Sequence, residues 1–203
     1  MLWSEFEARH GRLRQAGASA GALLRRLAVE GQHPQVLWIG CCDARVAPEQ
    51  IVGAGPGELF VLRNIANLVP PADGRDDSVG AALEYAVQHL GVAHVVVCGH
   101  THCGGIAALL AHADTAHEPH VARWLAGASE AVTRAAAYAP PAERALAAER
   151  ANVVLQLERL RQHPCVQSAE ARGALALHGW LFDLAEDALW AYDEALQRWA
   201  PLD

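Results

Sequence analysis

Two short stretches of this sequence carry side chains that could do chemistry together. The first is Cys41-Cys42-Asp43-Ala44-Arg45, and the second is His100-Thr101-His102-Cys103. Each follows an apolar run that ends in glycine, residues 36–39 before Gly40 and residues 94–98 before Gly99. Such runs are typical of buried strands, and the carboxyl ends of parallel strands meet at one edge of a sheet. We therefore expect the two stretches to lie close together.

The types of side chain in these stretches favour a metal centre. Thiolate sulfur and imidazole nitrogen are ligands that zinc prefers, and three protein ligands leave a fourth position open, as in catalytic sites. Cys41, His100 and Cys103 would form such a set. The alternative is that both cysteines are small core residues, the usual role of a free cysteine. The spacing of His100 and Cys103 leaves both alternatives open.

Asp43 and Arg45 favour the metal centre. A carboxylate two residues from a thiol ligand can coordinate the metal or accept a hydrogen bond from a water on it. Arg45 can pair with Asp43 through two hydrogen bonds and keep the carboxylate ionised. The alternative is an ordinary ion pair at the surface, which would contribute little to stability.

Composition excludes several classes of protein. The chain has 203 residues and a net charge of −7, so a basic face for nucleic acid is not expected. The first residues lack the pattern of a signal peptide, and no apolar run is long enough to span a membrane. Five cysteines, two of them adjacent, do not suggest a disulfide framework. We expect a cytoplasmic protein, where thiols stay reduced.

The pattern of apolar residues predicts an α/β fold. Strands are expected at 36–39, 58–63, 94–98 and 174–182, and a short fifth strand or hairpin return at 188–192. Helices between them favour a four-stranded, mostly parallel sheet with an edge strand, flanked by helices. The helices are expected at 4–30 (two segments), 79–90, 104–110, 118–137 and 142–162. In the last of these we expect Leu146, Val153, Leu157 and Leu160 to be buried.

The chain fits a single domain, residues 1–203. Within it we expect a helical arm at 1–31, a core that carries the chemistry at 32–183, and a carboxyl-terminal extension at 184–203.

The two stretches together resemble the Cys-x-Asp-x-Arg and His-x-x-Cys signature of the β-class carbonic anhydrases. Other segments between residues 32 and 183 resemble the family in the same order, so the joint match is specific. These are Pro48-Glu49-Gln50-Ile51, Gly55-Pro56-Gly57-Glu58-Leu59-Phe60-Val61, Arg63-Asn64-Ile65-Ala66-Asn67, Leu83-Glu84-Tyr85-Ala86-Val87 and Leu177-His178-Gly179-Trp180.

The resemblance implies a zinc enzyme that reversibly converts carbon dioxide into bicarbonate and a proton by means of zinc-bound hydroxide. Cys41, His100 and Cys103 would bind the zinc, Asp43 would orient the hydroxide, and Arg45 would fix Asp43. In a closed state at lower pH, Asp43 would become the fourth ligand. Cys42 stands where the family usually has serine or alanine, so we interpret it as a bystander.

The resemblance also implies a binding site for substrate and a homo-oligomer, either a dimer or a dimer of dimers. Gln32, Tyr85 and Gly104 would line the substrate cleft, with the glutamine offered by the neighbouring subunit.

A second site is implied for one subgroup of the family, in which three side chains bind an inhibitory bicarbonate away from the zinc. Trp38 and Arg63 match two of them, but Phe182 stands where the third is usually tyrosine. The loss of that hydroxyl removes one hydrogen bond, worth about 1 kcal/mol, so we expect a regulatory pocket that binds bicarbonate more weakly.

Two other functions are compatible with the same residues. One is a related zinc hydrolase that acts on carbon disulfide or carbonyl sulfide, because these are also linear molecules attacked at carbon. The other is a non-catalytic module that binds zinc or bicarbonate. The Asp43–Arg45 pair argues against the module, since a pure binder has no need to orient a hydroxide.

Overall fold

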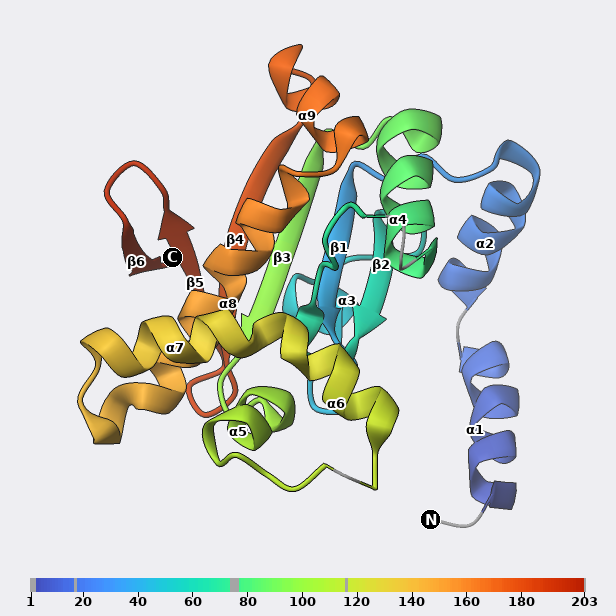
Figure 1. Ribbon diagram of the computed structural model, residues 1–203. Coiled ribbons are helices and arrows are strands. Elements are labelled where there is room, and N and C mark those ends of the chain that lie inside the picture. Colours follow the sequence, from blue (N-terminus) through green and yellow to red (C-terminus); the bar gives the residue numbers. More distant parts are fainter. Residues whose placement is uncertain (1–2, 17, 74–76, 116, 203) are drawn as a thin grey trace.

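The computed structural model of the chain describes residues 3–16, 18–73, 77–115 and 117–202. These residues contain a six-stranded sheet with the strand order β2-β1-β3-β4-β5-β6 (Figure 1). Neighbouring strands from β2 to β4 are parallel, whereas β5 and β6 are added antiparallel. The strands are β1 (Val36–Cys41), β2 (Leu59–Asn64), β3 (His94–His100), β4 (Ala176–Asp183), β5 (Ala188–Asp193) and β6 (Arg198–Pro201).

The expected α/β fold is confirmed, with one strand more than the sequence predicted. β6 was not expected, because it is short and contains Pro201. Proline is tolerated there because β6 ends the sheet and needs hydrogen bonds on one side alone.

Helices occur at the expected places, but several are divided into shorter segments. The helix expected at 79–90 consists of α4 (Asp77–Glu84) and a π-helical continuation, η2 (Tyr85–Leu90), and ends at Gly91 in the left-handed conformation. The other helices are α1 (Trp3–Ala16), α2 (Ala18–Glu30), α3 (Pro48–Ile51), η1 (Ile65–Asn67), α5 (Gly104–Leu110), α6 (Pro119–Leu125), η3 (Ala126–Ala128), α7 (Ser129–Tyr138), η4 (Pro141–Glu143), α8 (Arg144–Leu160) and α9 (Pro164–Ala171).

The largest core lies between one face of the sheet and α4, α8 and α9. Successive side chains of a strand point to opposite faces, so Leu37 and Ile39 of β1 enter this core. Trp38 points to the other face, where it packs with Val96 and Phe182 in a smaller cluster. Both faces of the central strands are therefore apolar, as the uninterrupted apolar runs predicted.

Helix α8 packs closely on the sheet, because glycines of β3 and β4 face it. A Cβ atom on Gly99 would lie 2.7 Å from Val153, and one on Gly179 would lie 2.9 Å from Leu157. Val153, Leu157 and Leu160 are buried, as expected. The prediction for Leu146 was wrong. Its side chain is 36% exposed, because it lies in the first turn of α8, near the end of the packed stretch.

The first two helices form an arm that leads away from the sheet (Figure 1). Leu27 of α2 contacts the main body at Gly57, whereas Trp3 and Phe6 of α1 are exposed and stack on each other. None of the helices in the described ranges is long and apolar enough to cross a membrane. The division into arm, core and extension stays a prediction, although β5 and β6 of the last segment join the common sheet.

Candidate metal centre

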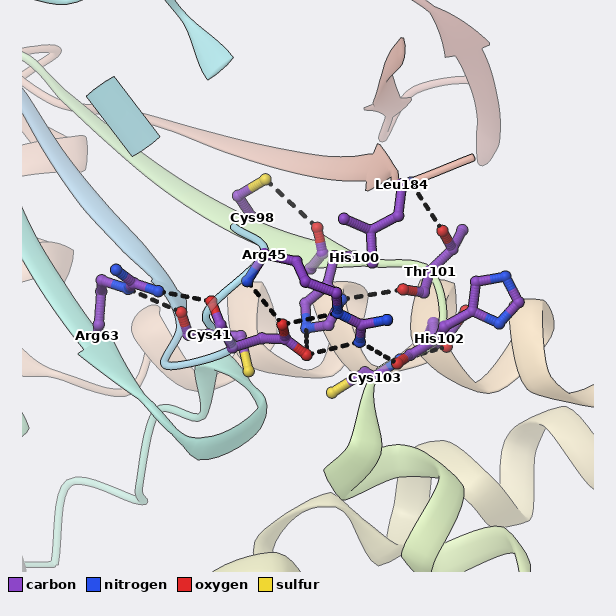
Figure 2. A network of polar contacts seen from close by, with 12 residues as sticks. Cys41, Arg45, Arg63, Cys98, His100, Thr101, His102, Cys103 and Leu184 are labelled. Atoms are coloured by element: carbon purple, nitrogen blue, oxygen red, sulfur yellow. Dashed lines mark hydrogen bonds and ion pairs between the residues drawn. The ribbon is translucent and has the colours of Figure 1, made fainter. Parts of the chain in front are cut away.

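Three buried ligand atoms converge at the carboxyl-terminal edge of the sheet. Cys41 is the last residue of β1, His100 is the last residue of β3, and Cys103 directly precedes α5. One ligand atom from each lies within 4.8 Å of the other two. Figure 2 shows both thiols and the His100 ring directed toward the same point. Among the described residues, this is the single group of three such side chains that could hold a metal ion.

His100 is oriented for metal binding by its own backbone. Its Nδ1 lies 2.9 Å from the carbonyl oxygen of Thr101, and a carbonyl can only accept, so Nδ1 carries the proton. Nε2 is therefore the nitrogen with the free lone pair. It is buried, and no hydrogen-bond partner for it exists within the described part of the chain. A metal ion would satisfy this atom, which shows that the residues fit one.

The two thiols differ in their affinity for protons. The pKa of Cys41 is lowered to about 4, chiefly because Cys103 donates a hydrogen bond to its sulfur. The pKa of Cys103 is raised, by the neighbouring Cys41 and by burial. Backbone amides favour the thiolate form of both residues. The amides of Asp43 and Ala66 act on Cys41, and amides of α5 act on Cys103. Without a cation the pair keeps one proton, and a divalent cation would replace it.

Asp43 lies beside the three ligands and is held by Arg45. The Asp43 oxygens accept from Nε and Nη2 of Arg45 at 2.9 and 2.7 Å, and the backbone amide of Arg45 adds a third hydrogen bond at 3.0 Å. The Arg45 guanidinium holds the pKa of this carboxyl well below its usual range. Oδ2 of Asp43 lies 3.9 Å from Nε2 of His100. The carboxylate is thus ionised at the edge of the centre.

Arg45 also joins the two stretches to each other. Its Nη2 donates to the carbonyl oxygen of His102 at 3.0 Å, in addition to its bond with Asp43 (Figure 2). The His102 ring itself is exposed and turned away from the thiols (Figure 2). Cys42 is exposed as well, and it is not part of the ligand group.

Arg63, in β2, contacts the stretch Cys41–Asp43 from the side opposite to His102 (Figure 2). Its Nε donates to the Cys41 carbonyl at 2.9 Å, and Nη2 donates to the Asp43 carbonyl at 2.8 Å. Trp38 and Phe182 are buried together on one face of the sheet. Nε1 of Trp38 has no hydrogen-bond partner among the described residues.

The predicted substrate residues do not all lie at the metal centre. Gly104 follows Cys103 directly and begins α5. Gln32 and Tyr85 instead line a separate hollow of about 680 Å³, together with Leu27, Gly57 and His89. No metal ligand lines this hollow. Gln32 precedes β1, whereas Cys41 ends it, and the first and last residues of a six-residue strand lie about 17 Å apart.

One buried acidic residue near the centre was missed in the sequence. The carboxylate of Glu149, on α8, accepts the backbone N–H of Cys103 at 3.0 Å. Burial raises the pKa of Glu149, and the amides of Cys103 and His102 partly oppose this. A signal was present, because Glu149 stands four residues before Val153, on the stripe of α8 that faces the core.

Comparison with known proteins agrees with this geometry. The family model described as carbonic anhydrase matches residues 36–189, which include all three ligands. The chain belongs to the carbonic anhydrase family. A carbonic anhydrase of Pseudomonas aeruginosa is 42% identical over 191 residues, which are 93% of this chain and 86% of the relative.

Solved structures place the chain in the β class of carbonic anhydrases. The β-carbonic anhydrase CcaA superposes with a TM-score of 0.92 at 32% identity, over 99% of this chain and 92% of that one. A tetrameric β-carbonic anhydrase of Sordaria macrospora gives a TM-score of 0.81 at 32% identity, over 98% and 100% of the two chains. Hydration of carbon dioxide at a Cys-His-Cys zinc site is therefore the function of this chain.

Zinc content tests which thiols of this carbonic anhydrase bind the metal. We expect Cys41→Ser and Cys103→Ser to lose most of their zinc, because each removes one of three buried ligands. Cys42→Ser is the matched control and should keep it, since this thiol is exposed and outside the group. Metal analysis of the purified variants gives the answer. Near-stoichiometric zinc in both ligand variants would contradict the assignment.

Proposed function

We propose that Cys41, His100 and Cys103 hold the zinc, and that Asp43 and Arg45 orient the water that attacks carbon dioxide. The observation that carries this proposal is the position of Asp43. Its Oδ2 lies 3.9 Å from Nε2 of His100, and two hydrogen bonds from the Arg45 side chain fix the carboxylate. A site that only stored zinc would not need an ionised carboxylate held at its edge.

Zinc, when bound, lowers the pKa of a water to about 7 and so supplies hydroxide at neutral pH. Asp43 can act as an acceptor alone, because its pKa is low. Asp43 accepts a hydrogen bond from the O–H that remains after the attacking water has lost a proton. This directs a lone pair of the water oxygen toward the carbon of carbon dioxide. Arg45 keeps Asp43 in this orientation, and its bond to His102 ties the orientation to the loop that carries Cys103. Bicarbonate then leaves, and the proton of the next water passes to bulk solvent.

The closed state predicted from the sequence uses the same carboxylate differently. If the Asp43 carboxylate left Arg45, its Oδ2 would be near enough to His100 to serve as the fourth zinc ligand. The intact Asp43–Arg45 pair supports the open arrangement for the described conformation.

Replacement of Asp43 tests its role. We expect Asp43→Asn to lower kcat for carbon dioxide hydration by about 10- to 100-fold, because the amide no longer acts as a pure acceptor and loses its ion pair with Arg45. The zinc content should stay unchanged. Asp193→Asn, in β5, is the control and should hydrate carbon dioxide normally. Stopped-flow assays measure both, and a normal kcat for Asp43→Asn would refute the role.

We further propose that the active site is completed by a second copy of the chain. Gln32 and Tyr85 share a hollow at the opposite end of β1 from the metal ligands, so one chain cannot bring all of these groups together. A dimer or dimer of dimers would place this hollow beside the partner's metal centre. The tetrameric relative in Sordaria macrospora supports assembly of this kind.

Mixing of two defective chains tests this arrangement. Asp43→Asn and Gln32→Ala should each be impaired alone. When the two are co-expressed, about half of the dimers are hybrids, and each hybrid has one site with both residues intact. We expect about a quarter of the normal activity to return. Activity no higher than that of the two variants alone would show that Gln32 acts within its own chain, or not at all.

The regulatory pocket predicted at Trp38, Arg63 and Phe182 is also retained as a proposal. Nε1 of Trp38 is a buried donor that finds no partner in the described part of the chain, and a bicarbonate there would satisfy it. Two nitrogens of Arg63 are engaged by the carbonyls of Cys41 and Asp43, so an anion bound to Arg63 would act on the loop of the metal ligand.

Phe182 determines how strongly such an anion would bind. We expect Phe182→Tyr to strengthen inhibition by bicarbonate about five-fold, because one added hydrogen bond is worth about 1 kcal/mol. Inhibition constants for the two proteins make the comparison, with Phe6→Tyr, at an exposed position of α1, as the control for an added hydroxyl elsewhere. Unchanged inhibition in Phe182→Tyr would contradict the pocket.

Carbon dioxide and bicarbonate are the substrate pair. The cytoplasmic location stays a prediction, which five cysteines that are free in the structure support, because thiols stay reduced in the cytoplasm.

A further inference from the structure

The loop that carries two of the three zinc ligands has a strained backbone. His102, between them in sequence, has a φ of 58°, in the left-handed region that a residue with a side chain rarely adopts. Such a conformation persists when the surrounding contacts hold it. The peptide that leaves His102 must therefore be fixed from outside, because its rotation would redirect the Cys103 thiol.

Two of these contacts come from neighbouring loops. The Thr101 hydroxyl accepts the Leu184 amide at 3.0 Å, and Arg45 donates to the His102 carbonyl at 3.0 Å (Figure 2). Both reach the loop at residues before Cys103. Arg45 is largely exposed, so its contact competes with water.

The third contact comes from the interior and acts on Cys103 itself. Glu149 is 5% exposed, and its Oε1 accepts the Cys103 amide at 3.0 Å. A carboxylate is costly to bury, and it is seldom found inside a protein without a specific partner. No ion pair to Glu149 is seen among the described residues, and its described hydrogen-bond partner is the backbone of this loop.

Glu149 belongs to a polar stripe on the buried face of α8. Asn152 donates to the carbonyl of Ala66 at 3.0 Å, and Gln156 accepts the amide of Val69 at 2.8 Å. All three side chains are buried. Gly99 and Gly179 let this helix approach the sheet closely enough for these polar side chains to reach the loops. Along the stripe, Glu149 is the member that contacts a zinc ligand, whereas Gln156 contacts a different loop, at Val69 after β2.

We propose that Glu149 is a positioning residue of the zinc site, which fixes the amide of Cys103 and thereby aims its thiol at Cys41 and His100. It contacts neither the metal nor the substrate. Its effect passes through the His102–Cys103 peptide, whose carbonyl is held by Arg45 on one side and whose amide is held by Glu149 on the other. The two contacts together restrain that peptide against rotation. The proposal rests on the assignment of zinc to this site.

Three variants of Glu149 separate its possible roles. Glu149→Gln keeps an acceptor of the same length, Glu149→Asp withdraws it by one methylene, and Glu149→Ala removes it. We expect Glu149→Ala and Glu149→Asp to release zinc to a chelator about 10- to 100-fold faster than the parent protein does. This is the usual effect of losing a group that orients a metal ligand. Gln should release it at a rate within about three-fold of the parent, since the acceptor remains. If Glu149→Ala does not fold, Glu149→Asp provides the test.

The visible spectrum of the cobalt-substituted protein gives a second readout, because it depends on the geometry of the ligands. The spectrum should shift in Glu149→Ala and Glu149→Asp and should match that of the parent protein in Glu149→Gln. Gln156→Ala is the matched control, a buried polar residue of the same helix that binds a different loop. It should lower the melting temperature with normal zinc release and a normal cobalt spectrum.

Two results would overturn the proposal. One is normal zinc release and a normal spectrum in Glu149→Ala or Glu149→Asp. The other is an equal change in Gln156→Ala, which would show that any loss of polar packing on α8 disturbs the site. If the parent protein itself held no zinc, the assigned function would fail instead, and the zinc content of the parent distinguishes that case.

Discussion

Parallel pairing of β1 with β3 is the constraint on which the site depends. Gly40 pairs with Cys98, so both strands leave the sheet at the same edge within two residues of each other. Cys41 and His100 thereby approach from separate strands, and the turn after His100 returns the chain to Cys103 before α5 begins. The ligands are held by backbone that is buried on both faces of the sheet. Such a site keeps its geometry without help from the metal, which reduces the free energy needed to organise it on binding.

The close packing of α8 supports this edge from one side. Glycines at the contact allow the helix to lie directly on β3 and β4, and its polar side chains reach into the loops that follow β2 and β3. Strained residues occur in those same loops, at Ala66 and His102. The stability of the large core thus maintains conformations that local preference would not choose. Arg45 completes the arrangement by linking the loop after β1 to the loop after β3.

Much of this arrangement could be predicted from the sequence, because the features concerned are local. Apolar runs that end in glycine located the strands, and reactive side chains directly after them located the ligands Cys41, His100 and Cys103. The Asp43–Arg45 pair is separated by one residue, so it was also accessible. What escaped prediction depends on contacts distant in sequence. Glu149 is 46 residues from its partner Cys103, and residues 198–201 form a strand because they pair with β5. Gln32 was expected from a neighbouring subunit, but that Tyr85 shares its hollow, away from the ligands of its own chain, became visible with the fold itself.

The central claim is that a zinc centre of Cys41, His100 and Cys103 with Asp43 at its edge hydrates carbon dioxide. The most direct test is stopped-flow hydration of carbon dioxide across the pH range from about 7 to about 9, with zinc determined on the same sample. Our account predicts about one zinc per chain and a kcat that rises with pH as the attacking water loses its proton. Full zinc occupancy without measurable hydration of carbon dioxide anywhere in this range would contradict it.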